Sequence, residues 1–338
     1  MVSLLRTRGY FVRLLVGVVL SVIGIAPAPA TLYGVRTIDS GPAAGDSQLL
    51  LIEPSTGSFT YGAILPVTGM FDMAFSPNGV LYGIRSIDAG SFRLFTINTA
   101  TGAIADGPIV GSDLVAGTLT NVRSIAFSPA GDLYAVKSLD APIGSDNSVA
   151  FKINTATGVI SDSSFLLPAN IVSTAFSPGG DLYGTRPVDS GPFLGQTGLF
   201  KIDLANGLPF DGTFVALTNM RGISFSSTGV LYGIRAIDSG PFAGFSGLVT
   251  IDPLTGISDF PGGLPVSTTN IFDIAFSPTL VPEPEIYAMM LSGIGLLGFV
   301  ARRRQGKKKR RSTSPNIAGF WLRLHPSQFN ARSTAVPA

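Results

Sequence analysis

The most regular charged pattern in the sequence is a base followed three residues later by an aspartate. It occurs five times, each time directly after Leu-Tyr-Gly or Leu-Tyr-Ala, as Arg36/Asp39, Arg85/Asp88, Lys137/Asp140, Arg186/Asp189 and Arg235/Asp238. A ring of such pairs on one face could grip a carbohydrate or a cation. Alternatively, each pair is a salt bridge or turn cap within its own repeat. We favour the structural interpretation, because the pattern keeps its symmetry and accepts a lysine, which lacks the forked geometry of arginine.

The residue inventory excludes several kinds of catalysis. The chain has no cysteine, which excludes thiolate nucleophiles, disulfides and Cys-ligated zinc. Its single histidine, His325, excludes a His-based triad or a multi-His metal site within one chain. Between residues 31 and 281 the one glutamate is Glu53, and most aspartates occupy repeat-equivalent turns. A carboxylate-pair glycosidase remains within this inventory, but we expect no catalytic residue, no cofactor and no metal ligand.

The charge of the chain is segregated, although its formal net charge is only +2. Residues 31–281 hold ten bases and nineteen carboxylates, a formal charge of −9. A body this acidic repels phosphate backbones, which argues against a nucleic-acid-binding protein.

The elements that carry the charged motif form an internal repeat. Leu-Tyr-Gly or Leu-Tyr-Ala begins at Leu32, Leu81, Leu133, Leu182 and Leu231. A segment resembling Ala-Phe-Ser-Pro precedes the last four copies, and a fifth such segment ends at Pro278. Large and small residues alternate with period 2, which indicates strands with one face packed against a neighbour. With 41 Gly and 24 Pro and only 13% charged residues, the composition favours an all-β fold.

We predict a five-bladed β-propeller over residues 31–280, with four strands in each blade of about 49 residues. Kelch blades have this length. The mature chain begins with a second-type strand at Leu32 and ends with a first-type strand, Ile271 to Phe276. The last strand can therefore complete the first blade and leave no open sheet edge. The alternatives are an open β-solenoid or a two-sheet sandwich, neither of which has a use for the displaced strand.

The first thirty residues, 1–30, have the pattern of a secretory signal peptide. Three arginines precede an apolar run, Leu14 to Ile25, and Ala28-Pro29-Ala30 is a small-x-small cleavage site. We expect cleavage after Ala30. The alternative is an uncleaved membrane anchor, although the run is short for a span of about 20 residues.

A second apolar segment lies near the C-terminus. It begins with Val281-Pro282-Glu283-Pro284, continues through Ile286 to Ala301, and ends with Arg302-Arg303-Arg304. We expect residues 286–301 to form a transmembrane helix of roughly 24 Å, with the arginines on the cytoplasmic side.

Residues 281–304 resemble the PEP-CTERM sorting signal of Gram-negative bacteria. The matching features are the Pro-Glu-Pro site, the glycine-bearing apolar run and the arginine cluster. The resemblance implies a chain that is the substrate of an exosortase, a membrane-embedded peptidase. The alternative is an ordinary tail anchor. One departure is that the chain continues for 34 residues beyond the arginines.

The final segment, 305–338, is basic and has no core-forming period, so we expect it to be disordered. Its Lys307–Arg311 run lies beside the apolar segment, which is typical of an anchor for anionic lipid headgroups rather than a nucleic-acid site.

Together these features predict an exported, non-catalytic propeller that passes through a membrane-anchored stage to the cell envelope or the extracellular matrix. The resemblance suggests extracellular polysaccharide or surface proteins as partners. The competing hypothesis is a propeller-fold polysaccharide hydrolase or lyase, which would need an asymmetric carboxylate cluster at one mouth of the channel.

Overall fold

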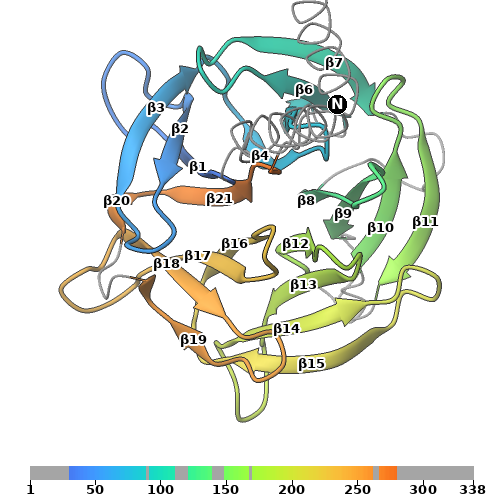
Figure 1. Cartoon of the computed structure of the whole chain (residues 1–338), viewed down its shortest axis with the longest axis vertical. Helices are drawn as coiled ribbons and strands as arrows, with labels where there is room; N and C mark the ends of the chain where they lie inside the picture. The colour runs from blue at the N-terminus through green and yellow to red at the C-terminus, as the bar shows by residue number, and fades with distance from the viewer. Residues whose placement is uncertain are drawn as a thin grey trace, which may run out of the picture. The chain divides into compact units, whose positions relative to one another are not determined.

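The computed structural model describes residues 30–88, 91–110, 121–138, 148–166, 170–261 and 266–279. Their strands form five antiparallel sheets, which are arranged as blades around a common axis (Figure 1). These described residues contain no α-helix. The predicted five-bladed β-propeller is therefore confirmed.

Each blade runs from an inner strand at the channel to an outer strand at the rim. From the inside outwards, blade 1 consists of β21 (Ile271–Phe276), β1 (Leu32–Thr37), β2 (Ser47–Ile52) and β3 (Phe59–Leu65). Blade 2 consists of β4 (Met70–Phe75), β5 (Leu81–Asp88), β6 (Ser91–Ile97) and β7 (Ile104–Val110), and blade 3 of β8 (Val122–Phe127), β9 (Leu133–Ser138), β10 (Ser148–Ile153) and β11 (Ile160–Leu166). Blade 4 consists of β12 (Ser173–Phe176), β13 (Leu182–Pro187), β14 (Thr197–Ile202) and β15 (Pro209–Val215). Blade 5 consists of β16 (Met220–Phe225), β17 (Leu231–Ala236), β18 (Phe245–Ile251) and β19 (Ser258–Asp259), and β20 (Val266–Thr269) also pairs with β18.

Blade 1 contains strands from both ends of the repeat region, as predicted from the strand that is left over at its C-terminal end. β21 pairs antiparallel with β1, with Leu32 opposite Phe276 and Gly34 opposite Ile274. Beyond the strands, the Ser277 N–H donates to the Thr31 carbonyl at 2.9 Å, and the Thr31 N–H donates to Ser277 Oγ at 2.8 Å. The inner strand of the first blade thus comes from the far end of the repeat, and the ring has no open sheet (Figure 1).

The core consists of five apolar clusters, each shared by two adjacent blades. The period-2 alternation explains this division, because successive side chains of a strand face opposite neighbours. In β1, Leu32 lies in the cluster shared with blade 5, whereas Val35 lies in the cluster shared with blade 2.

A repeated aromatic pair joins each blade to the next. The tyrosine of each Leu-Tyr motif packs on the phenylalanine of the following Ala-Phe-Ser-Pro-like segment, with ring centroids 5.1–5.5 Å apart. The five pairs are Tyr33–Phe75, Tyr82–Phe127, Tyr134–Phe176, Tyr183–Phe225 and Tyr232–Phe276. These phenylalanines are packing residues, as expected from their repeat positions, and such pairs add about 0.5–1.5 kcal/mol beyond area burial.

The outer hairpins also pack closely on the preceding blade. Gly158, in the turn between β10 and β11, has a φ of 74°, and a Cβ at this position would lie 2.2 Å from the Ile109 carbonyl oxygen of β7. Only glycine satisfies both conditions, because other residues are strained at positive φ and carry a Cβ.

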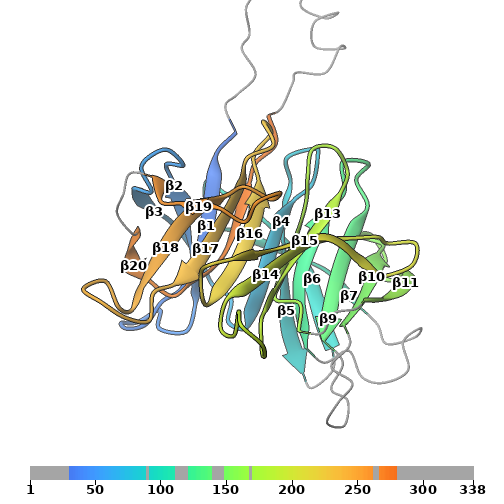
Figure 2. The ribbon, with the colours of Figure 1, turned by 90° about the horizontal axis from the view of Figure 1, so that it is seen from below.

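The two ends of the channel differ in what they carry. The inner strands end and the second strands begin at one face of the ring, which we call the exit face. The phenylalanines that end the inner strands of all five blades line a cavity at this face. The first residues of β1 and the last of β21 both lie there (Figure 2). The opposite face, where second strands end, carries the Arg-x-x-Asp motifs, and we call it the motif face.

Several predicted segments lie outside the described residues. These are the signal peptide with Ala28, the sorting signal, the helix at 286–301 and the basic tail. Within the described ranges, the chain forms no helix with the length and apolarity to cross a membrane.

Candidate functional site

The Arg-x-x-Asp motifs are spread around the motif face, one on each blade. The base is the fifth residue of the second strand in every blade, and the aspartate follows at or just beyond the strand end. In blade 3, Lys137 is buried at 2% exposure, and its partner position Asp140 lies outside the described residues. The role of each motif residue is therefore inferred from the residues that it contacts.

The aspartates of blades 1 and 5 cap the segment that leads into the inner strand of their blade. Asp39 accepts hydrogen bonds from Thr269 Oγ1, at 2.8 Å, and from the Asn270 side chain. Asp238 accepts from Thr218 Oγ1, at 3.3 Å, and from the Asn219 side chain in the same way. Both asparagines have positive φ just before the inner strand, a conformation that asparagine tolerates better than most residues.

Electrostatics in blade 1 agree with this capping role. Hydrogen bonds from Thr269 and Asn270 lower the pKa of the Asp39 carboxyl, and the positive charge of Arg36 lowers it further. Arg36 itself donates from Nη1 to Thr268 Oγ1 at 2.8 Å and lies 5.4 Å from the centre of the Tyr61 ring. The motif base and the motif acid thus interact electrostatically, although each forms its hydrogen bonds with different partners.

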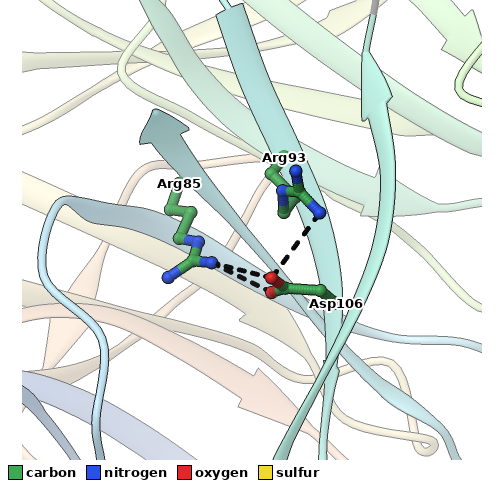
Figure 3. Close-up of polar contacts among 3 residues, drawn as sticks. All are labelled: Arg85, Arg93 and Asp106. Carbon is green, nitrogen blue, oxygen red and sulfur yellow. Dashed lines mark hydrogen bonds and ion pairs between the residues drawn. The ribbon is translucent and has the colours of Figure 1, made fainter. Parts of the chain in front are cut away.

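In blade 2 the motif base pairs with a carboxylate from a different strand. Arg85 Nη2 lies 3.0 and 3.1 Å from the two oxygens of Asp106 on β7, and Arg93 Nη1 on β6 lies 3.5 Å from the same carboxylate. Figure 3 shows Asp106 between the two guanidinium groups. In blade 5, Arg235 donates to the Ala236 carbonyl and to Thr218 Oγ1, both at 3.4 Å.

These contacts correct the expectation of an ion pair within each motif. The ion pairs among the described residues are Arg85–Asp106, Arg93–Asp106, Lys152–Asp132 and Lys201–Asp181, and none joins the base and acid of one motif. The described bases bond instead to an outer strand or to the segment before the inner strand, and the aspartates of blades 1 and 5 bond to that same segment. The other structural alternative, a turn cap, describes blades 1 and 5.

Blade 4 departs from this pattern. Arg186 and Asp189 take no hydrogen bond or ion pair from the described residues; instead, both line a cavity of about 570 Å³. In the sequence, the threonine that meets the aspartate in blades 1 and 5 is replaced by Ala169. Arg186 therefore differs from Arg36, Arg85 and Arg235, each of which bonds to a described residue.

The cavity lies between blades 4 and 5 on the motif face, and we call it the blade 4–5 cavity. Its charged and amide lining consists of Arg186, Asp189 and Gln196 from blade 4 and Asn219 and Arg221 from blade 5. Its apolar lining includes Val172, Val188, Leu194 and Met220. Arg221, like Arg186, has no hydrogen bond or ion pair with any described residue.

A second constellation lies along the central channel. Each inner strand is a sheet edge, so some of its N–H groups have no partner in the sheet. At four of the five seams, a polar side chain at one repeat-equivalent position of the inner strand accepts a hydrogen bond from a backbone N–H of the inner strand in the next blade. The bonds run from Met73 to Asp273 (2.8 Å), from Ile125 to Asp72, from Thr174 to Ser124 (2.9 Å) and from Ile223 to Ser173 (3.0 Å).

At the fifth seam the equivalent residue is Gly222, which has no side chain to accept this bond. A Cβ at Gly222 would lie 2.6 Å from Asp273 Oδ1. The glycine thus leaves room for the Asp273 carboxyl, which accepts the Ile274 N–H itself.

The two aspartates of this ring form a buried, hydrogen-bonded pair. Asp72 and Asp273 are 4% and 2% exposed and hydrogen-bond to one another. Burial raises the pKa of both carboxyls, and the charge of Asp72 raises the pKa of Asp273 further, so that it lies well above its usual range. We assign the proton to Asp273, which donates it to the Asp72 carboxylate.

This pair was not predicted from the sequence, because both residues fit the period of an ordinary strand. A signal was nevertheless present, since the equivalent residues Ser124, Ser173 and Gly222 are all small or polar. The pair does not line the 150 Å³ cavity in the channel, and its burial leaves it a structural role. No group of three or more metal-ligating side chains occurs within the described ranges.

The blades and the closing strand define the described part of the chain as a five-bladed β-propeller. Residues 280–304 match the PEP-CTERM protein-sorting motif, so the chain carries this signal directly after the propeller. The motif implies that the protein is exported in a Gram-negative bacterium and sorted by an exosortase from a membrane-anchored form. No curated protein matches the chain significantly in sequence.

Solved structures resemble the chain at low sequence identity. A putative 6-phosphogluconolactonase from Bacteroides fragilis NCTC 9343 is 10% identical over 74% of this chain and 99% of its own, with a TM-score of 0.40. The PQQ-bound aldose sugar dehydrogenase from Streptomyces coelicolor is 18% identical over 67% of this chain and 66% of its own, with a TM-score of 0.37. A GH43 protein from Bacillus licheniformis is 12% identical over 57% of this chain and 42% of its own, with a TM-score of 0.42.

Proposed function

We propose that this protein is an exported binding module of the cell envelope or extracellular matrix, and that its ligand site is the blade 4–5 cavity. One observation carries the proposal: the motif arginines of blades 1, 2 and 5 bond to other described residues, whereas Arg186 of blade 4 bonds to none of them and lines a cavity. A side chain with a structural role bonds to other residues of the protein, whereas Arg186 lines a cavity that a ligand would fill.

The cavity has the size and the composition of a binding site. Its volume of about 570 Å³ falls within the range of about 300–1,000 Å³ that is usual for small-molecule sites. Apolar side chains such as Val188 and Met220 share the lining with a few charged and amide groups. Such a mixture provides contact area from the apolar groups and orientation from the polar ones.

The sorting motif suits the localisation in this proposal. It begins at residue 280, shortly after the last described strand ends at Phe276. The predicted helix at 286–301 and the basic residues after it would hold the precursor at the membrane lipid until the exosortase acts.

The non-catalytic character of the module is part of this proposal. A glycosidase of the usual kind needs two carboxyls on either side of the scissile bond, and the cavity lining contains one, Asp189. The two carboxyls that do lie together, Asp72 and Asp273, are buried beneath the channel lining. The rival hypothesis of a polysaccharide hydrolase or lyase therefore has no carboxylate pair in the lining of the blade 4–5 cavity.

A capture experiment tests the proposal. The full chain, purified in detergent and immobilised, is exposed to the exopolysaccharide of the producing bacterium, and retained polymer is measured by surface plasmon resonance. We expect retention by the native chain and by Arg235→Gln, and loss of retention by Arg186→Gln. Arg235 is the matched control, because it occupies the same repeat position but bonds within its own blade.

Two results would contradict the proposal. The first is absence of retention by the native chain, and the second is equal retention by Arg186→Gln. Incubation with the same polymer, followed by assays for new reducing or unsaturated chain ends, separates binding from cleavage. We expect no new ends.

A further inference from the structure

We infer that the blade 4–5 cavity selects a ligand that bears a carboxylate, of the size of a short sugar-acid oligomer. This inference rests on the proposed function and names the chemistry of the ligand. Three features of the cavity carry it: its charge, its neutral lining and its contrast with the rest of the protein.

The charge of the cavity is positive within an acidic body. Arg186 and Arg221 supply two guanidinium groups, and Asp189 supplies the opposing carboxylate, which leaves one net positive charge. Residues 31–281 as a whole carry a formal charge of −9. An anion is therefore repelled by most of the surface and attracted here.

The chemistry of the two bases favours an oxyanion. Guanidinium groups bind carboxylates and phosphates through two parallel N–H···O bonds. Neither arginine bonds to a described residue, and both line the cavity.

The remaining lining suits a ligand with both apolar and hydroxyl groups. Val188, Leu194 and Met220 offer apolar surface, of which Leu194 is 67% exposed. Gln196 has an amide without a partner in the described residues, so it can bond to hydroxyl groups. Beside Leu194, Phe193 stacks on Phe214 with ring centroids 4.2 Å apart, and both rings stay about two-fifths exposed.

Sugar acids combine these properties in one molecule. Each unit has a carboxylate, several hydroxyls and an apolar face of C–H groups. A simple carboxylate would leave the apolar lining and the amide unused, and a neutral sugar would leave two arginines unpaired. The sugar-acid oligomer is therefore the ligand class that meets the whole lining.

Titration calorimetry on the full chain in detergent tests the inference with defined probes. The ligand is trigalacturonate, and the matched neutral ligand is maltotriose; inorganic phosphate tests for general anion binding. We expect binding of trigalacturonate that weakens as salt rises, and at least tenfold weaker or no binding of maltotriose and phosphate.

Variants then assign the binding to the cavity. Arg186→Gln and Arg221→Gln should each weaken trigalacturonate binding about tenfold, since a hydrogen bond to a charged group contributes about 1.5–3 kcal/mol. Asp189→Asn should strengthen it, because the opposing charge is removed. Arg235→Gln should leave it unchanged. A purely structural role of these residues would not produce opposite effects at positions 186 and 189.

The outcomes separate this inference from the proposed function. Equal binding of maltotriose and trigalacturonate, or no binding of trigalacturonate, overturns the carboxylate inference. If the polymer is still retained in an Arg186-dependent way, the proposed function stands and only the ligand chemistry is wrong. If Arg186→Gln and Arg221→Gln bind trigalacturonate normally, the cavity is not its site.

Discussion

The buried pair of Asp72 and Asp273 gives the sharpest prediction about stability. Asp273 joins blade 1 to blade 2, because its carboxyl accepts the Met73 N–H at 2.8 Å and bonds to Asp72. We therefore expect Asp273→Asn and Asp273→Ala to behave very differently. The asparagine keeps an oxygen acceptor and an N–H donor in place of the O–H, whereas the alanine removes both.

The magnitude follows from the hydrogen bonds that each variant loses. In Asp273→Ala, the N–H groups of Met73 and Ile274 lose their acceptor. A buried group left without its partner costs about 1–3 kcal/mol, so the two together cost about 2–6 kcal/mol. This is a large share of the about 5–15 kcal/mol that stabilises a typical domain. Asp273→Asn should stay within about 1 kcal/mol of the native protein at pH 5.

The pH dependence has a definite sign. The pKa of Asp273 is raised well above its usual range, whereas aspartates in the unfolded chain have a pKa near 3.9. Above about pH 4 the native state therefore binds more protons than the unfolded state, and stability falls as pH rises through the native pKa. Asp273→Asn lacks this titration, so its advantage over the native protein should grow from pH 5 to pH 8.

The other groups with a shifted pKa that bear on stability act outside the range from pH 5 to pH 8. The lowered pKa of Asp39 and of Asp252 affects stability only on the acid side, as their stabilisation is lost when pH falls through the folded pKa. The raised pKa of Lys152 and of Lys201 acts only at alkaline pH, as their stabilisation is lost when pH rises through the folded pKa. Between pH 5 and pH 8 the buried pair dominates the slope.

The assay is urea denaturation at pH 5, 6.5 and 8, with unfolding followed by circular dichroism. The control variant is Asp88→Asn, at an exposed position. Our reasoning is refuted if Asp273→Asn is as destabilised as Asp273→Ala at pH 5. It is also refuted if Asp273→Asn shows the same loss of stability between pH 5 and pH 8 as the native protein.

Three further predictions concern packing, the charged motif and closure. Gly158→Ala should lower the free energy of unfolding by more than about 3 kcal/mol, because left-handed strain of about 1–2 kcal/mol adds to the contact with the Ile109 carbonyl. The control is Gly131→Ala, which has a positive φ but nothing within 4 Å of the new Cβ. In the same denaturation assay it should show the effect of the strain alone. Arg235→Ala should lower stability by about 1 kcal/mol or less and leave polymer retention intact; lost retention at unchanged stability would contradict its structural role. Deletion of residues 270–278 should remove the inner strand of blade 1 and abolish cooperative thermal unfolding, and an unchanged melting curve would show that closure does not stabilise the ring.

The fold could be predicted because its information is local and repeated. The Leu-Tyr motif and the segment ending at Phe75 recur with nearly constant spacing, and their period-2 alternation fixes which side chains face each neighbour. Circular closure could also be predicted, since the strand that ends at Phe276 is left over from the repeat. It pairs with β1 as its position in the sequence required.

The candidate site could be predicted only in part. The sequence identified Arg186 and Asp189 as members of a repeated motif, but their neighbours come from other strands. Arg85 finds Asp106 on the outer strand of its blade, whereas Arg186 faces a cavity shared with Arg221 of the next blade. Which copy is left unsatisfied depends on these contacts across strands and blades, which no spacing along the chain reveals.

The sequence by itself thus determined the repeat, the number of blades, the closing strand and the sorting motif, because each depends on short-range pattern. Only the tertiary structure decided which charges are paired, which line a cavity and which are buried. Asp72 and Asp273 illustrate the difference: about two hundred residues separate them in the chain, and ring closure alone brings their carboxyls together. Burial then changes their protonation, because desolvation depends on everything that surrounds a group and not on its place in a pattern.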